Sequence, residues 1–186
     1  MYLRLALAEF CRETRAYRWP AIKLPLIQGI AEYTFPLSEF GRVYAMASIT
    51  YQGRPLEHLT PERLNARSPN WESETGRVYA YHLFGVNKIR FVRIPTETEV
   101  QAITCRPILV TTRATAQVSE DFADEWVETV AKLTAVKLMG LADQTWQNPK
   151  QAALLSQQLD MELLQIKTEA EQDHQFKDGL VQYGGY

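Results

Sequence analysis

The fold is decided by residues 119–140, which read SEDFADEWVETVAKLTAVKLMG. Their apolar residues recur at spacings of three and four, the period of a helix, along two neighbouring lines. One line holds Phe122, Trp126, Val130, Leu133 and Lys137, and the other holds Ala123, Val127, Ala131, Ala135 and Leu138. Ser119 is a typical N-cap, and Gly140 is expected to end the helix. Because the helix is apolar over a wide arc, we expect it to be central in the fold.

Two further helices are predicted, one near each end of the chain. Residues 1–18 carry an apolar face made by Leu3, Leu7, Phe10, Thr14 and Tyr17. Trp19-Pro20 should stop this helix, because proline removes a hydrogen-bond donor. Asn148-Pro149 opens a helix over 149–171, whose buried stripe is Ala152, Leu155, Leu159, Leu163 and Ile166. The period fades near Glu171, so residues 172–186 are predicted to form an extended tail.

Residues 21–113 change from the helical period to the alternation that is typical of strands. Strands are predicted at 33–37, 43–51, 77–84, 87–94 and 100–111, which are rich in Val, Ile, Tyr and Phe. Turn signals such as Gln52-Gly53 and Phe84-Gly85 separate them. Thr60-Pro61 predicts one short helix over 61–66. Short strands at this spacing indicate a small antiparallel sandwich or barrel.

The order of these segments predicts an α+β protein. The N-terminal helix must pair with the two C-terminal helices to bury its apolar face. We therefore expect a helical bundle from 1–20 and 114–171, with the small antiparallel β-sandwich or barrel of 21–113 inserted into it. Residues 172–186 would follow as an extended C-terminal tail.

Composition bounds the class of protein. The chain has 186 residues, 46% of them apolar and 23% charged, as in ordinary globular proteins. Arg4 and Glu9 interrupt the apolar N-terminus, and no apolar run approaches the roughly 20 residues that span a bilayer. The lone cysteines Cys11 and Cys105 fit a reducing compartment. We expect a soluble protein made in a cytoplasm, without a membrane partner.

Charge is divided unevenly along the chain. Residues 1–113 hold 15 Lys and Arg against 10 Asp and Glu, whereas residues 114–186 hold 5 against 12. One interpretation is two unrelated solvated surfaces. The other is that copies of the chain stack, with the basic part of one facing the acidic part of its neighbour. The sequence leaves both open.

Motifs that carry catalytic chemistry are missing from the sequence. His58, His82 and His174 lie far apart, and there is no HExxH, paired-cysteine, GxSxG, Walker or GxGxxG pattern. The carboxylates Asp121, Asp124, Glu125 and Glu128 are interpreted as complementing a helix dipole. We predict that the protein is not an enzyme and that it holds no metal and no cofactor.

Two features of the β segment have competing interpretations. Lys88, Arg90 and Arg93 form either an Arg-rich face for DNA or the wet side of a half-buried strand. The loop with Arg67, Asn70 and Trp71 is a candidate tail-side or inter-subunit contact, in which Trp71 is either an exposed anchor or a cap on the β module.

The whole layout resembles the head-to-tail adaptor, or head-completion, proteins of short-tailed bacteriophages. The resemblance rests on order and spacing over nearly the whole chain. It is carried by Leu7-Ala8-Glu9-Phe10-Cys11, Tyr33-Thr34-Phe35-Pro36-Leu37, Tyr51-Gln52-Gly53-Arg54-Pro55-Leu56, Pro69-Asn70-Trp71, Ile94-Pro95 and Trp146-Gln147-Asn148-Pro149. The ending Tyr183-Gly184-Gly185-Tyr186 is similar to that of some tail tubular adaptors.

This resemblance implies a structural virion protein at the head–tail junction. It would form a dodecameric ring that joins the portal protein to a tail nozzle or tail tube protein. Genomic DNA would pass through the lumen without sequence recognition, and assembly would take place in the bacterial cytoplasm. The alternative function is a DNA-binding or packaging accessory protein that uses the Arg-rich β face. A cell-wall-degrading tail enzyme is disfavoured, because no carboxylate–histidine constellation is present.

The C-terminal tail is the candidate portal-binding segment. It carries apolar and aromatic side chains with little to bury them in their own subunit: Phe176, Leu180, Val181, Tyr183 and Tyr186. Tyrosine offers a large contact area with few rotatable bonds, which suits an interface anchor. The competing interpretation is an ordinary frayed terminus.

Overall fold

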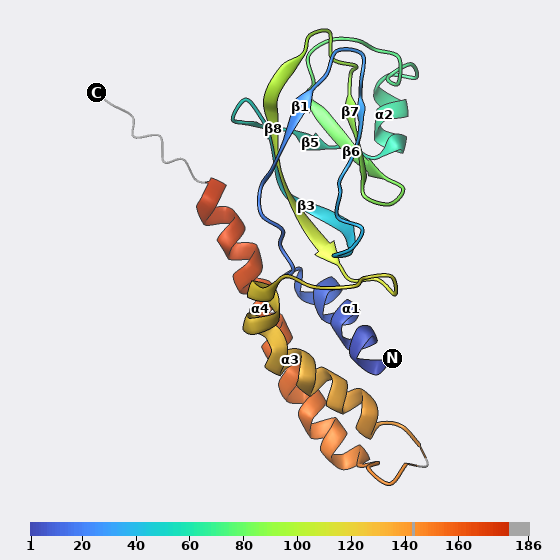
Figure 1. Ribbon diagram of the computed structural model, residues 1–186, viewed down its shortest axis with the longest axis vertical. Helices are drawn as coiled ribbons and strands as arrows, with labels where there is room; N and C mark the ends of the chain where they lie inside the picture. The colour runs from blue at the N-terminus through green and yellow to red at the C-terminus, as the bar shows by residue number, and fades with distance from the viewer. Residues whose placement is uncertain (143, 179–186) are drawn as a thin grey trace, which may run out of the picture. The chain divides into compact units, whose positions relative to one another are not determined.

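The structure of the protein, a computed structural model, describes residues 1–142 and 144–178. Side chains are described up to residue 172 of this part. Four helices and eight strands, the strands in two largely antiparallel sheets, confirm the predicted α+β class (Figure 1).

The chain divides into two compact units. The helical unit contains Met1–Tyr17, Val110–Arg113 and the described residues from Gln117 onward. The β unit contains Arg18–Leu109 and Ala114–Ala116. The chain therefore passes from the helical unit into the β unit and back, so each unit is assembled from separated segments.

Three helices build the helical unit: α1 at Tyr2–Thr14, α3 at Glu120–Met139 and α4 at Pro149–Asp178. Each of them contacts the other two. The Phe10 ring centroid lies 6.0 Å from that of Phe122 and 5.5 Å from that of Trp126. Leu159 and Ile166 of α4 are also buried. Burial of these apolar side chains holds the three helices together.

The first helix is shorter than predicted, since it ends at Thr14 instead of residue 18. Thr14 Oγ1 donates a hydrogen bond to the Phe10 carbonyl oxygen (2.8 Å) and accepts one from the Ala16 N–H (3.2 Å). Arg15 then adopts a left-handed backbone conformation with φ of 56°. These local bonds end the helix before Trp19-Pro20 is reached. Tyr17 nevertheless joins the core, with its ring 4.4 Å from that of Phe122.

The last helix is longer than predicted. Its N-cap is as expected, because Asn148 Oδ1 accepts a hydrogen bond from the Gln151 N–H (3.1 Å). The predicted end near Glu171 is wrong, because α4 continues to Asp178. Residues 172–178 are therefore helical and not part of an extended tail. Their sequence, QDHQFKD, contains no glycine or proline that would stop a helix.

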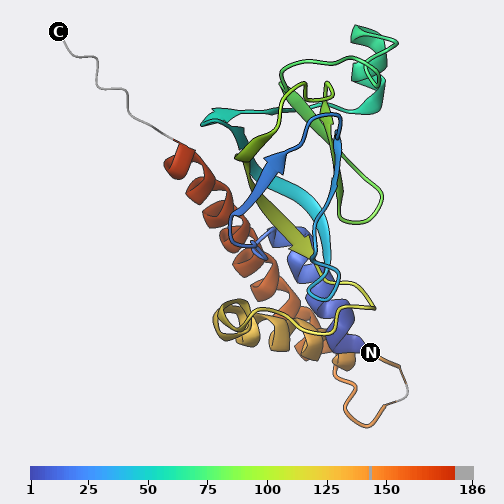
Figure 2. The ribbon, with the colours of Figure 1, turned by 45° about the horizontal axis from the view of Figure 1, so that its top comes forward.

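Two four-stranded sheets form the β unit (Figure 2). The first has the order β1-β8-β3-β4, formed by Ile22–Leu26, Glu99–Val110, Arg42–Tyr51 and Arg54–Pro55. The second has the order β2-β7-β6-β5, formed by Glu32–Thr34, Lys88–Val92, Ala80–Phe84 and Glu57–His58. The short pair β5–β6 is parallel, and the other pairs with a described register are antiparallel.

The predicted strands and the short helix are present with shifted ends. The run 77–84 becomes β6 at Ala80–Phe84, and 87–94 becomes β7 at Lys88–Val92. Helix α2 at Pro61–Arg67 matches the prediction over 61–66. Its Leu64 is buried in a cluster with Leu59, Trp71, Ala80 and Val92, so α2 covers the second sheet.

Asn87 ties the β6–β7 turn to the other sheet. Its side chain is 4% exposed and its backbone is left-handed, with φ of 55°. Asn87 Oδ1 accepts a hydrogen bond from the Val43 N–H (2.6 Å), and Nδ2 donates one to the Gly41 carbonyl oxygen (3.1 Å). A single amide thus satisfies two backbone groups at the start of β3.

Candidate interaction surfaces

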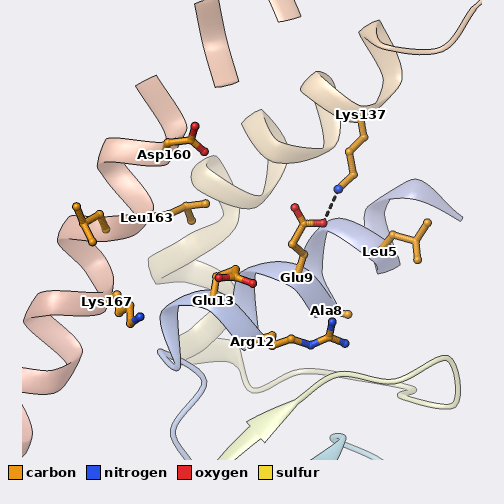
Figure 3. Close-up of a pocket in the computed structure, with 10 residues that line it drawn as sticks. Leu5, Ala8, Glu9, Arg12, Glu13, Lys137, Asp160, Leu163 and Lys167 are labelled. Carbon is orange, nitrogen blue, oxygen red and sulfur yellow. Dashed lines mark hydrogen bonds and ion pairs between the residues drawn. The ribbon is translucent and has the colours of Figure 1, made fainter. Parts of the chain in front are cut away.

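A groove of about 680 Å³ opens between the helices of the helical unit (Figure 3). It is lined by both apolar and charged side chains, namely Leu5, Ala8, Glu9, Arg12 and Glu13 of α1, Lys137 of α3, and Asp160, Leu163, Leu164 and Lys167 of α4. Leu5 is 43% exposed and Leu164 is 65% exposed. Apolar side chains this exposed at the rim of a groove are typical of a protein-binding surface.

One ion pair lies in the groove, where Lys137 Nζ donates a hydrogen bond to Glu9 Oε2. The outward side of α1 carries the exposed arginines Arg4 and Arg12, and the exposed Arg15 follows at its C-cap. Arg4 Nη1 donates a hydrogen bond to the Arg113 carbonyl oxygen (3.1 Å), which carries no formal charge to pair with the guanidinium. Among the described residues, no ion pair joins any of these three arginines to a carboxylate. This side of α1 is therefore a basic surface.

The solvent side of α3 has the opposite charge. Its first three turns expose Glu120, Asp121, Asp124, Glu125 and Glu128. None of the ion pairs between described residues includes them. Next to them Val127 is 61% exposed. The expectation that α3 is central therefore holds for only one of its apolar lines, because Phe122, Val130 and Leu133 are buried and Val127 and Ala131 are exposed.

The loop after α2 holds the second group of predicted site residues. Trp71 is 5% exposed, and its indole N–H donates to Asn65 Oδ1 (2.8 Å). Its ring packs edge-on against His82, with 5.3 Å between ring centroids. Of the two interpretations of this tryptophan, the structure supports the cap on the β unit. Arg67 and Asn70 are exposed, with Arg67 Nη1 donating to Glu57 Oε2 (3.2 Å).

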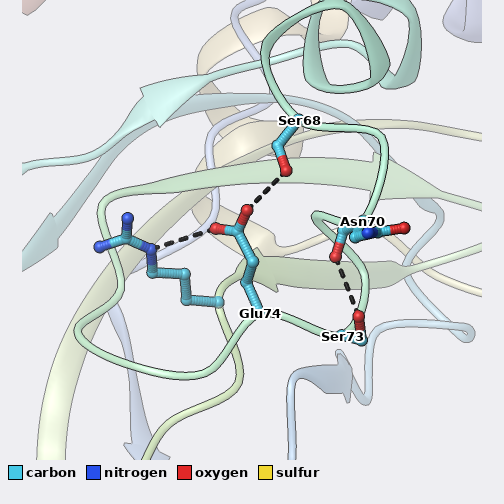
Figure 4. Close-up of polar contacts among 5 residues, drawn as sticks. Ser68, Asn70, Ser73 and Glu74 are labelled. Carbon is cyan, nitrogen blue, oxygen red and sulfur yellow. Dashed lines mark hydrogen bonds and ion pairs between the residues drawn. The ribbon is translucent and has the colours of Figure 1, made fainter.

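Polar contacts shape the rest of this loop (Figure 4). Ser68 Oγ donates to one oxygen of Glu74 (2.6 Å), and Arg93 Nε donates to the other (3.4 Å). These two donors lower the pKa of Glu74, the Ser68 hydrogen bond most. Ser73 Oγ donates to the Asn70 carbonyl oxygen (3.0 Å). These side-chain contacts hold the loop, in which Asn70 is exposed, and Arg67 is exposed at the end of α2 that precedes it.

The basic residues of β7 and the residue after it, Arg93, make contacts within the β unit. Arg90 donates to Glu32 Oε1 (2.5 Å) and to the Glu72 carbonyl oxygen (2.7 Å). Its guanidinium also lies over the Trp71 ring. Arg93 pairs with Glu74, and the Lys88 ammonium lies 5.9 Å from the centroid of the Phe84 ring. These contacts leave Lys88 as the one exposed cation of the set that pairs with no described carboxylate.

A smaller polar cleft of about 310 Å³ lies in the β unit beside the β3–β4 turn. Glu99 accepts hydrogen bonds from Tyr51 Oη (2.5 Å) and Gln52 Nε2 (2.6 Å). The bond to this carboxylate is the main cause that raises the pKa of Tyr51. Arg77 donates to Gln52 Oε1 (3.3 Å) and lies over the Tyr51 ring. This network ties β3 to β8.

Within the described residues, no group of three or more His, Cys, Asp and Glu could hold a metal ion. His82 is buried, which lowers its pKa, and the nearby Arg90 charge lowers it further. Burial raises the pKa of Cys11 and of Cys105 to about 12. A buried thiol of this kind is a poor nucleophile. In the same part of the chain, no helix has the length and hydropathy needed to cross a membrane.

The predicted portal-binding residues lie largely outside the described part. Leu180, Val181, Tyr183 and Tyr186 belong to the residues that the structure does not describe. Phe176 lies within α4, and its side chain is outside the described ones. Their assignment stays a prediction.

The sequence model of the SU10 adaptor protein family matches residues 1–179. The chain belongs to this family of phage adaptor proteins, which confirms the resemblance seen in the sequence. No curated protein matches the chain. Membership implies a structural role at the head–tail junction of a virion and, in general, interaction with portal and tail proteins.

The sequence pattern did not reveal the groove or the separate charged sides of α1 and α3. A signal was present, since Arg4, Arg12 and Arg15 avoid the apolar face of the first helix. The acidic residues of α3 were interpreted as complementing its dipole, and the uneven charge left open that the acidic part of the chain faces a neighbouring copy. Which charged side chains of α1 and α3 are exposed depends on how the three helices pack against one another.

Proposed function

We propose that the protein forms a ring, the dodecamer implied by its family resemblance, that docks on the portal and carries the tail. Support comes mainly from the family match, which covers both units from residue 1 to 179. In this proposal the ring stands between portal protein and a tail nozzle or tail tube protein. Arg67 and Asn70, exposed on the β unit, are the proposed tail-side or inter-subunit contacts.

DNA passes through the lumen of the proposed ring without being read. Two of the three cations of the supposed DNA face, Arg90 and Arg93, are paired with Glu32 and Glu74. An ion-paired arginine has to lose its carboxylate partner before it can bind a phosphate. The contacts therefore favour the adaptor over the DNA-binding accessory protein. Binding of fluorescently labelled DNA at low and high salt separates these two functions. A dedicated DNA-binding protein binds the DNA tightly at low salt and loses it at high salt.

The proposed portal anchor is the C-terminal segment 176–186. Its deletion should leave the melting temperature nearly unchanged, because the described cores of both units lie outside it. The deletion should abolish co-sedimentation with portal-bearing heads, since Phe176, Tyr183 and Tyr186 would supply the contact area.

Full-length protein and the truncated variant are compared on the same heads, and heads that lack the portal serve as the control. Negative-stain images should show a ring on the portal for the full-length protein alone. Equal binding by the truncated variant would show that this segment is not the anchor. If the full-length protein fails to bind portals, the adaptor proposal itself fails.

A further inference from the structure

The helical unit presents two unlike surfaces whose charges are opposite. The basic surface is the outward side of α1, with the exposed Arg4 and Arg12 on the helix and the exposed Arg15 at its C-cap. Arg12 and Leu5 of this helix also line the groove. The acidic surface is the solvent side of α3, with five carboxylates from Glu120 to Glu128 beside Val127. Neither set is neutralised by an ion pair among the described residues.

Apolar side chains lie within both charged surfaces. Leu5 and Leu164 are 43% and 65% exposed at the groove, and Val127 is 61% exposed on α3. Solvated helix faces ordinarily carry polar side chains at such positions. An exposed apolar centre with a charged surround is the pattern of a protein interface.

The charges also match in spacing. Arg4 and Arg12 are eight residues apart on α1, as are Glu120 and Glu128 on α3. At about 1.5 Å of rise per residue, each pair spans roughly 12 Å along its helix. Two helices laid side by side could therefore bring both ends into opposite-charge contact at once. Complementary charge of this kind sets register and excludes like surfaces.

We propose that the α1–α4 groove of one copy receives the acidic side of α3 from a second copy. Leu5 and Leu164 contact Val127 across this interface, and Arg4 and Arg12 face carboxylates between Glu120 and Glu128. The contact buries the second apolar line of α3, so that α3 becomes the central helix that its wide apolar arc predicts. The inference rests on the proposed ring and specifies how its copies adjoin.

The two surfaces are different parts of the chain, so the contact is heterologous. Each copy offers a groove to one neighbour and an acidic helix to the other. Repetition by rotation then closes a ring, whereas a self-complementary contact would stop at a dimer. The groove lining itself is balanced, with carboxylates from Glu9, Glu13 and Asp160 and cations from Arg12, Lys137 and Lys167. The excess of positive charge on this surface therefore comes from Arg4 and Arg15, which are exposed and lie outside the groove lining.

A charge exchange tests the contact. Arg4→Glu with Arg12→Glu should abolish ring assembly on portal-bearing heads, and so should Glu120→Lys with Glu128→Lys, the pair with the same spacing. Copies that carry all four substitutions should assemble again, because the opposite charges are restored. Arg63→Glu with Glu171→Lys is the matched control, since both side chains are exposed outside the proposed contact. Assembly by either charge-reversed pair, or no recovery in the fourfold variant, would overturn the inference.

A cysteine pair supplies a test that does not depend on loss of assembly. Leu5→Cys with Val127→Cys should give a ladder of disulfide-linked multimers when assembled copies are oxidised. Mixed single variants should give dimers only, and either variant alone should give no linked species. The natural cysteines do not interfere, because Cys11 and Cys105 are buried. Rings on the portal without a ladder refute the interface and leave the adaptor proposal standing, whereas absence of wild-type rings refutes the adaptor proposal.

Discussion

At the scale of single residues, Asn87 does more than its place in a turn suggests. The sequence predicts a turn here from Phe84-Gly85, and it predicts no long-range contact for Asn87. Its amide reaches Val43 and Gly41, more than forty residues away in sequence. Such contacts depend on how two sheets meet, so local sequence patterns do not contain them.

Replacing this side chain should destabilise the β unit. Asn87→Ala leaves the Val43 N–H and the Gly41 carbonyl without their partner, and an unmade buried hydrogen bond costs about 1–3 kcal/mol. Alanine also tolerates a positive φ less well than asparagine. Urea denaturation followed by tryptophan fluorescence measures the loss. Asn70→Ala, on the exposed loop, is the control and should change stability little; equal effects of the two substitutions would contradict the assigned role.

His82 should make stability depend on pH. Burial lowers its pKa in the folded protein below the unfolded value of 6.5. The unfolded chain therefore binds the proton more readily, so the contribution is fully present above about pH 6.5 and is lost as pH falls through the folded pKa. Denaturation at pH 7 and pH 5 should show a smaller loss for His82→Gln than for the wild type. His58→Gln, an exposed position, should keep the wild-type loss.

At the scale of elements, the period of the sequence predicted the kind of each helix and of the longer strands from residue 33 onward, but not their ends. It missed strand β1 at Ile22–Leu26. Helix α1 ends early because Thr14 and Arg15 form a local stop, whereas the predicted stop was proline. Helix α4 runs past Glu171 because helix-compatible polar residues continue it without an apolar stripe. The spacing of apolar residues shows where a helix packs against the rest of the protein. Its backbone hydrogen bonds determine where it begins and ends.

The sequence pattern also missed two short strands and their pairing. Strands β4 and β5 are two residues each, too short to show an alternation. The parallel pairing of β5 with β6 likewise has no signature in so short a segment. For the candidate surfaces, residue types indicated charge and apolarity. Whether an arginine is ion-paired depends on long-range partners that no spacing predicts. Arg90 pairs with Glu32, and Arg93 pairs with Glu74.

At the scale of the whole molecule, one chain supplies buried apolar side chains to each of two compact units. Phe10, Tyr17 and Phe122 belong to the helical unit, and Ile89, Phe91 and Ile103 belong to the β unit. The family match spans the residues of both. An order of helix, strands and helices was readable from periodicity, because period changes at the borders of the inserted segment.

The two buried cysteines can be used to measure how often each unit opens. Cys11 lies in the helical unit and Cys105 in the β unit, and each has a pKa raised to about 12. A thiol reagent can modify them only during opening, so the labelling rate at each site measures how often that unit opens. Asn87→Ala should speed labelling of Cys105 and leave that of Cys11 unchanged, as read by mass spectrometry of peptides. An equal increase in the labelling rates of Cys11 and Cys105 would mean that the two units open together. Both thiols would then report one opening reaction of the whole chain.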